Sequence, residues 1–311
     1  MAFHHVSVMS EEVIDALNIN PDGTYVDATL GGGGHSLAIA RKLSDHGRLI
    51  GIDQDDAAIQ AATERLAGVS CSLRLERVNF AHLDDVLKND KAPAVDGILF
   101  DLGVSSHQID TAERGFSYMH DAPLDMRMDR RKNISACDLV NSLPAADLAQ
   151  LFYEYGEERY AKRIARAIES ARREAPVTRT LELVSIIDKA IPQSAKYKIH
   201  GHSAKRVFQA LRIAVNNELD ILPAAIRSAV GHLKPGGRLA VITFHSLEDA
   251  LVKRTLKELA VSCVCPPDMP VCVCGHKADI KILGRPLKPT VEETERNSRA
   301  RSAKLRTAEK L

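Results

Sequence analysis

The sequence lacks any apolar run near the roughly 18 residues that a membrane-spanning helix needs. The first residues, Met1 to His5, also lack the basic region and apolar core of a secretory signal. Apolar and charged residues make up 45% and 27% of the 311 residues, which is typical of an ordinary globular protein. We therefore expect a cytoplasmic protein with no membrane partner.

The chain also has little net charge, +1 in total, but the charge is unevenly distributed. Residues 1–100 carry 8 Lys/Arg against 15 Asp/Glu, whereas residues 159–212 carry 13 against 4. A basic segment of this kind is typical of a surface that binds phosphate backbones, although a solvated helix face is an equal alternative. The side chains that we expect to face nucleic acid are Arg163, Arg166, Arg172, Arg173, Lys196, Lys198, Lys205 and Arg206.

A short apolar strand at 24–27 is followed by four glycines, Gly31 to Gly34, and then by a helical pattern. A second apolar strand follows and ends at Asp53. A strand, a glycine turn, a helix and an acid about 20 residues later form the nucleotide-binding βαβ arrangement, in which the acid accepts ribose hydroxyls. The sequence thus predicts a site for an adenosine-containing cofactor.

Strand patterns at 24–27, 48–53, 73–80 and 95–102 alternate with helical patterns, which predicts a parallel, doubly wound α/β sheet. Ligands of such sheets lie beyond the carboxyl ends of the strands. Asp27, Asp53, Phe80 and Asp101 all fall at or near these ends. We expect them to converge on one site.

The alternation stops near residue 110, and only helical patterns follow until a strand resumes at 237–244. This predicts a sheet domain in two parts, 1–109 and 205–311, with an all-helical insertion at 110–204. One long helical pattern covers 205–229. The segment beyond Val291 is basic, serine-rich and weakly apolar, so we expect a flexible tail.

Two missing residues narrow the choice of cofactor. No lysine follows the glycines, as a phosphate-binding P-loop would require, and Ser36 occupies the third glycine position of a dinucleotide site. The frame Asp27-x-Thr29-x-Gly31-x-Gly33 is one substitution from the Asp-x-Gly-x-Gly-x-Gly pattern of S-adenosylmethionine enzymes. S-adenosylmethionine is therefore the expected cofactor, with nicotinamide as the alternative.

Eight strings make a more specific resemblance possible. They are DATLGGGGHS (27–36), GIDQD (51–55), DLGVSSHQID (101–110), RGFSY (114–118), PLDMRMD (123–129), FHSLED (244–249), CVCPPDMPVCVCG (263–275) and NSRARSAKLR (297–306). In this order they resemble the bacterial 16S ribosomal RNA cytosine-N4 methyltransferase family (RsmH, formerly MraW), over nearly the whole chain.

The resemblance implies a Rossmann-like S-adenosylmethionine methyltransferase sheet, with a helical insertion that recognises the substrate. It implies methyl transfer to the exocyclic amine of a cytidine in the decoding region of 16S rRNA, within a small ribosomal subunit that is assembled or nearly so. The oligomeric state is left open between monomer and homodimer. The family's cofactor contacts correspond to Gly33, Gly34, His35, Asp53, Phe80, Asp101 and Gln108.

Asp101 stands where amine-directed methyltransferases carry the loop that accepts hydrogen bonds from the amine, but the usual prolines and aromatic residue are absent. His245 follows the strand at 237–244 and is a candidate to bind or deprotonate the base. Ser246 is a weaker candidate, because with Asp249 three residues later it also fits a helix cap. Phe80 has a comparable alternative as a core residue.

Four of the six cysteines gather at Cys263, Cys265, Cys272 and Cys274. In a cytosolic chain such a cluster suggests a metal more than a disulfide. The Cys-x-Cys spacing, however, differs from the Cys-x2-Cys of zinc ribbons, so we expect no metal here.

Three alternative functions stay open at this point. An amine-directed DNA methyltransferase would use nearly identical chemistry. A protein that binds cofactor or RNA without catalysis is consistent with the absent prolines after Asp101. A nicotinamide oxidoreductase is disfavoured by Thr29 and Ser36.

Overall fold

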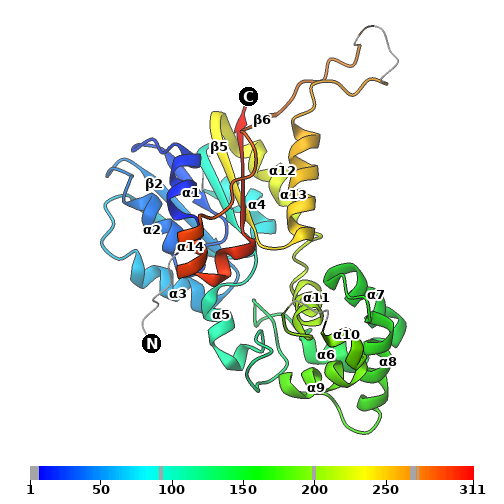
Figure 1. Cartoon of the computed structure of the whole chain (residues 1–311). Helices are drawn as coiled ribbons and strands as arrows, with labels where there is room; N and C mark the ends of the chain where they lie inside the picture. Colours follow the sequence, from blue (N-terminus) through cyan, green and yellow to red (C-terminus); the bar gives the residue numbers. More distant parts are fainter. Residues whose placement is uncertain (1–6, 91–93, 198–200, 267–270, 272) are drawn as a thin grey trace. The chain divides into compact units, whose positions relative to one another are not determined.

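The computed structural model describes residues 7–90, 94–197, 201–266, 271 and 273–311. The chain forms two compact units, of which the first combines Met1–Gly103 with Leu219–Leu311 and the second is Val104–Glu218 (Figure 1). Among the described residues, no helix is both long enough and apolar enough to cross a membrane.

The first unit contains a seven-stranded sheet with the order β3-β2-β1-β4-β5-β7-β6 (Figure 1). Its strands are β1 (Thr24–Asp27), β2 (Arg48–Asp53), β3 (Ser72–Arg77), β4 (Val95–Asp101), β5 (Leu233–Thr243), β6 (Ile280–Ile282) and β7 (Lys304–Lys310). Strands β1 to β5 pair in parallel, while β7 is antiparallel to both β5 and β6. The predicted α/β sheet is confirmed.

Helices cover both faces of this sheet, which is why its central strands are apolar on both sides. One face packs against α4 (Leu83–Asn89), α12 (Leu222–His232) and α13 (Ser246–Leu259). The other packs against α1 (Ser10–Leu17), α2 (Gly34–Ala40) and α3 (Asp56–Arg65). The short elements η1 (Phe80–His82), α14 (Val291–Arg296) and η3 (Ser298–Ser302) complete the unit.

The second unit is helical, and no strand occurs among its described residues. Its elements are α5 (Ser106–Asp110), η2 (Ala112–Arg114), α6 (Ala136–Ser142), α7 (Ala145–Gly156), α8 (Ala161–Arg172), α9 (Thr180–Ala190), α10 (Gln193–Lys196) and α11 (Lys205–Asn216). Ile164, Ala165 and Ile168 form the buried face of α8.

The boundaries of the helical unit differ from the expected 110 and 204, because α11 packs with it. Val207, Phe208 and Leu211 on α11 are buried in the core of the helical unit. The helical pattern at 205–229 is also two helices rather than one. Asn217 ends α11 in the left-handed conformation, with φ 57°, and α12 starts only at Leu222.

The expectation of a flexible C-terminal tail is wrong. Residues 304–310 form β7, which lies inside the sheet between β5 and β6. Leu305 and Ala308 are buried there, although the segment around them is basic. The basic neighbours find an acidic partner, because Lys304 Nζ and Arg306 Nε donate to Asp249 of α13 at 2.8 and 2.7 Å.

Because Asp249 binds both Lys304 and Arg306, Asp249→Ala should strongly lower the free energy of unfolding. Burial raises the pKa of Asp249, but the hydrogen bonds from Arg306 and Lys304 outweigh burial and hold that pKa below its ordinary value. Removing one partner of a largely buried pair costs about 3 kcal/mol of unfolding free energy. Urea unfolding at pH 7 measures this loss, which should shrink as the pH falls below the ordinary carboxyl pKa of about 4.

Asp279→Ala is the matched control, since Asp279 pairs with Lys310 of the same strand at 3.5 Å but is 49% exposed. Its loss should stay under about 1 kcal/mol. Equal losses for the two variants would contradict a special role of Asp249 in holding β7.

Candidate functional site

The turn from β1 into α2 is held by a buried carboxylate. Asp27 accepts hydrogen bonds from Ser36 Oγ at 2.7 Å and from the Thr29 amide at 3.2 Å. Burial raises the pKa of Asp27, against the lowering effect of the Ser36 hydrogen bond. Ser36, which marked the departure from a dinucleotide pattern, is thus the hydroxyl that ties the helix to the strand.

The register of the strands brings three carboxylates to one edge of the sheet. Asp27 pairs with Gly51 on one side and with Leu99 on the other. β2 and β4 therefore each continue two residues beyond β1, to Asp53 and Asp101. These three strand ends therefore lie at one edge of the sheet, and a common ligand site there, with Phe80, stays a prediction.

Gly33 and Gly34 meet packing requirements of their own. Gly33 has a φ of +73°, and a Cβ there would lie 3.1 Å from the Cβ of Ala62 on α3. A Cβ on Gly34 would lie 2.0 Å from Ser7 Oγ. Gly33 therefore needs glycine for the fold, whereas the hydroxyl near Gly34 belongs to a side chain that can rotate away.

Asp53 uses both carboxylate oxygens to hold loops at the end of β2. It accepts from the Gly31 amide at 2.8 Å and from the Asp55 amide at 2.9 Å. Burial raises the pKa of Asp53 to about 6, although these two amide hydrogen bonds lower it. Each oxygen keeps a further lone pair, so Asp53 can accept two more hydrogen bonds from a ligand.

His35 and Asp101 lie in contact, with His35 Nε2 at 3.5 Å from Asp101 Oδ2. Burial lowers the pKa of His35, but Asp101, Asp27 and Glu293 raise it by more, so the net shift is upward from 6.5. Asp101 Oδ1 is buried and has no hydrogen-bond partner among the described residues. The sequence predicted both residues at the site but did not predict this pairing.

Thr29 also contacts Asp101. Its Oγ1 accepts a hydrogen bond from the Asp101 amide at 2.5 Å, which joins the β1 loop to the end of β4. Thr29 stands where the methyltransferase pattern has its first glycine, and that substitution was the available signal for a role of its side chain.

Phe80 lies in η1, after β3 has ended at Arg77. Its ring packs edge-on against Phe100, with 5.7 Å between centroids, and it joins the core while staying half-buried. Asn79 donates to Gln54 at 2.8 Å and so connects the loops after β3 and β2. The core interpretation of Phe80 is supported, and its half-exposed ring leaves a ligand contact as a prediction.

The residues after β5 form the N-terminus of α13. His245, rather than Ser246, is the cap, because His245 Nδ1 accepts from the Glu248 amide at 3.4 Å. Glu248 is buried and accepts from the Phe244 amide at 2.9 Å, while its other oxygen lies 3.0 Å from His245 Nε2. Ser246 is exposed, and the side chain of Asp249 accepts a hydrogen bond from Lys304 of β7. The direct chemical roles of His245 and Ser246 stay predictions.

Gln108 belongs to the helical unit and is not among the residues that the sheet brings together. Its side-chain oxygen accepts from the Ser105 amide at 3.0 Å, and its own amide donates to Ser105 Oγ at 3.2 Å. This capping box starts α5. The cofactor contact implied for Gln108 stays a prediction.

The basic side chains of the helical unit differ in how available they are. Arg163 and Arg166 project from α8 into solvent. Arg172 is half-buried and donates to the Val140 carbonyl at 2.6 Å, and Arg173 pairs with Glu169 at 3.5 Å. Lys196, Lys205 and Arg206 are at least partly exposed, whereas Lys198 lies outside the described residues.

At the edge of the sheet, then, a glycine turn and a helix N-terminus lie beside Asp53, Asp101 and the buried ring of His35. Such an edge suits a ligand with hydroxyl groups and a positive charge, because its acceptors outnumber its donors. Asp101 Oδ1 can accept one further proton or hydrogen bond.

The chain is similar to known methylases over its whole length. A family model described as the MraW methylase family matches residues 2–311. The chain is 54% identical over 312 residues to ribosomal RNA small subunit methyltransferase H of Clostridium botulinum (strain Loch Maree / Type A3), covering 100% of both chains. It is 51% identical to the protein of that name from Brevibacillus brevis, covering 100% of this chain and 99% of the other.

Among solved structures, an rRNA methylase from Streptococcus thermophilus aligns with a TM-score of 0.41 and 13% identity, covering 97% of this chain and 93% of that one.

The contact between His35 and Asp101 can be tested by titration. NMR of the histidine rings should find His35 titrating above its ordinary 6.5, because nearby carboxylates stabilise the imidazolium. In Asp101→Asn the pKa of His35 should fall by about one unit or more. The variant lacks the Asp101 carboxylate that stabilises the imidazolium, whereas burial still lowers the pKa. Asp45→Asn, at an exposed carboxylate, is the control and should leave the His35 curve unchanged. An unshifted His35 in Asp101→Asn would contradict the pairing.

Proposed function

The chain belongs to the MraW methylase family, and on that premise we propose that it methylates the exocyclic N4 amine of a cytidine in the decoding region of 16S rRNA. The family is one of methyltransferases, so the protein is an enzyme. The observation that carries the proposal of amine chemistry is Asp101 Oδ1, a buried acceptor without a partner at the end of β4.

The residues at the sheet edge fit S-adenosylmethionine, which is the methyl donor. When bound, this cofactor supplies a methyl group on a sulfonium. Asp53 would accept the two ribose hydroxyls with its remaining lone pairs, and its pKa of about 6 keeps it ionised at neutral pH. Gly33, Gly34, His35 and Phe80 are the further contacts that we propose, at the turn and in η1.

Asp101 would accept a hydrogen bond from the cytosine amine. The lone pair of that amine is delocalised into the ring, so an acceptor must draw on its proton as the new C–N bond forms and the C–S bond breaks. His35 holds Asp101 in place from the start of α2 and offers a positive partner. Because the reaction is a direct displacement, positioning supplies most of the acceleration.

The residues after β5 would contact the base from the adjacent loop. Phe244 lies near Gly103, since a Cβ on Gly103 would be 3.5 Å from the Phe244 ring. His245 is fixed by Glu248, which supports binding of the base more than removal of its proton. Ser246 is exposed next to His245, and we propose that it also contacts the base. We propose Gln108 as a contact of the cofactor.

The proposed substrate follows from the relatives, which are named for methylation of small-subunit ribosomal RNA. We propose 16S rRNA within an assembled or nearly assembled small subunit, and hence a cytoplasmic place of action. A base in folded RNA must be turned out to react, at a cost of a few kcal/mol. The exposed basic side chains of the helical unit would supply the phosphate contacts that offset it.

Asp101→Ala tests the proposed reaction. In cells that lack this protein, mass mapping of small-subunit RNA should find one cytidine without its methyl group, which the wild-type chain restores and Asp101→Ala does not. With purified enzyme, labelled methyl transfer should fall by about 10²–10⁴ in kcat for the loss of a general base or acceptor. Calorimetry should find that the variant still binds the cofactor, although more weakly, because Asp101 is one of several expected cofactor contacts.

Asp85→Ala, at an exposed carboxylate on α4, is the matched control and should transfer methyl groups at the wild-type rate. Naked DNA, free ribosomal RNA and small subunits are offered in parallel. Methyl transfer to DNA alone would overturn the RNA substrate, and cofactor binding without turnover on any RNA would overturn catalysis.

Arg163→Glu/Arg166→Glu tests the role of the helical unit. Both side chains are exposed on α8 without a partner within the unit among the described contacts. If each contacts a phosphate, the double reversal should weaken RNA binding at least about tenfold and flatten its salt dependence. Affinity for the cofactor should not change.

Lys253→Glu/Arg254→Glu gives the same charge change on exposed side chains of α13 in the first unit. It should weaken RNA binding much less. Equal effects of the two double variants would remove α8 from the interface.

A further inference from the structure

The segment between α13 and β6 extends away from the rest of its unit (Figure 1). Its described residues bury almost nothing. Val261, Val264, Val271 and Val273 are 38%, 63%, 68% and 74% exposed. A stretch with so little apolar burial has no core of its own to hold it, and small unsupported segments of this kind usually need a covalent or metal cross-link.

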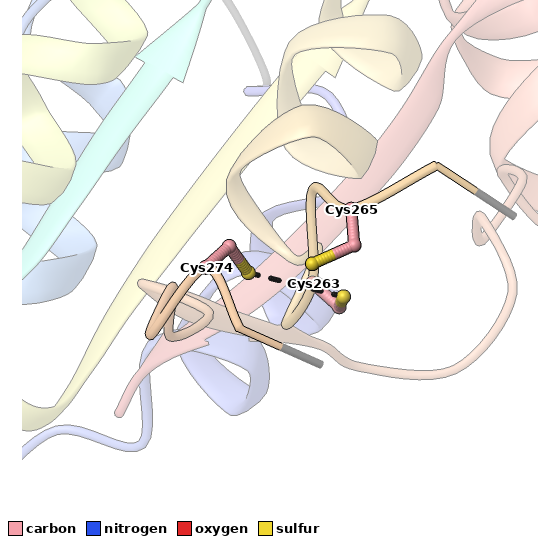
Figure 2. Close-up of side chains that lie close together, drawn as sticks. All are labelled: Cys263, Cys265 and Cys274. Carbon is pink, nitrogen blue, oxygen red and sulfur yellow. Dashed lines mark hydrogen bonds between the residues drawn. The ribbon is translucent and has the colours of Figure 1, made fainter. Parts of the chain in front are cut away.

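Three cysteine sulfurs nevertheless meet in this segment (Figure 2). Cys263 and Cys265 come from the part that follows α13, and Cys274 comes from the part that returns toward β6. The three sulfurs lie within 4.8 Å of one another, and the Cys274 thiol donates a hydrogen bond to Cys263 Sγ at 3.9 Å. These sulfurs therefore bring together the two parts of the segment.

We propose that Cys263, Cys265 and Cys274 bind one zinc ion. Zinc–thiolate bonds of about 2.3 Å in a tetrahedral site place the sulfurs about 3.8 Å apart. The separation of 3.9 Å between the sulfurs of Cys263 and Cys274 matches that edge. The third sulfur needs to move by less than about 1 Å to complete such a face of the tetrahedron.

The chemistry of the ligands favours zinc over other partners. Thiolates are soft ligands that select zinc over magnesium or calcium. A disulfide would need sulfurs at about 2.05 Å, whereas the sulfurs of Cys263 and Cys274 lie 3.9 Å apart.

The spacing of the cysteines alone argued against a metal, because neither pair is a Cys-x2-Cys knuckle. The structure changes that argument, since the sulfurs of Cys263 and Cys265, which form one pair, come together with that of Cys274 across the segment. Cys272, the remaining member of the sequence cluster, lies outside the described residues. Bound zinc would hold the segment that follows the C-terminal end of α13, whereas His245 lies at the N-terminal end of that helix. The zinc would therefore be a structural cross-link and would take no part in methyl transfer.

The test is metal analysis of the full-length chain, purified under reducing conditions without chelator or polyhistidine tag. We expect about one zinc per chain, the stoichiometry of a single structural site. Cys263→Ser/Cys274→Ser should retain less than a tenth of that amount. Cys137→Ser, in α6 of the helical unit, is the matched control and should keep all of it.

A second measurement does not depend on the variants. The wild-type chain stripped of metal should bind cobalt(II) with a thiolate-to-metal absorption band, and zinc should displace it. Absence of zinc together with absence of that band would overturn the proposal. So would full retention of zinc by Cys263→Ser/Cys274→Ser, or a Cys263–Cys274 disulfide in freshly purified protein.

Discussion

The buried carboxylate of Asp27 is the interaction on which the site depends. By accepting from Ser36 and from the Thr29 amide, it fixes the turn between β1 and α2. That turn then positions three other contacts: the Gly31 amide on Asp53, Thr29 Oγ1 on the Asp101 amide, and His35 against Asp101. The glycines permit the turn. Asp27, at the end of β1, determines where the residues of that turn meet Asp53 at the end of β2 and Asp101 at the end of β4.

Several of the sequence strings that are typical of the family contain residues that stabilise the fold. RGFSY and PLDMRMD contribute buried side chains to the core of the helical unit, including Phe116, Leu124 and Met126. Asn216 fastens the second string from α11, accepting from the Met128 amide and donating to the Met126 carbonyl at 2.8 Å each. FHSLED and NSRARSAKLR meet through Asp249, Lys304 and Arg306. A string typical of a family is therefore no sign by itself that each of its residues touches a substrate.

The sequence was sufficient to predict the sheet, the alternation of its first strands and the gathering of Asp27, Asp53 and Asp101, because buried parallel strands have continuous apolar runs. It was not sufficient for β7, whose two buried residues, Leu305 and Ala308, are outnumbered by charged neighbours. Nor could it assign the cap of α13, since the choice of His245 over Ser246 depends on where β5 ends. Contacts between distant segments, such as His35 with Asp101, have no local pattern to reveal them.

The uneven charge of the chain can be explained by where its acidic and basic residues lie in the two units. The acidic excess of the first 100 residues includes Asp27 and Asp53 at the edge of the sheet, and together with Asp101 these favour the cationic sulfonium of the methyl donor. His35 beside Asp101 limits that negative charge, because its pKa is raised and it is more often protonated than an ordinary histidine. The basic excess of 159–212 includes exposed side chains on α8, away from the sheet in sequence and in unit. A cationic donor and a polyanionic substrate make opposite electrostatic demands, and a chain that serves both must keep the two charges on separate parts of its surface.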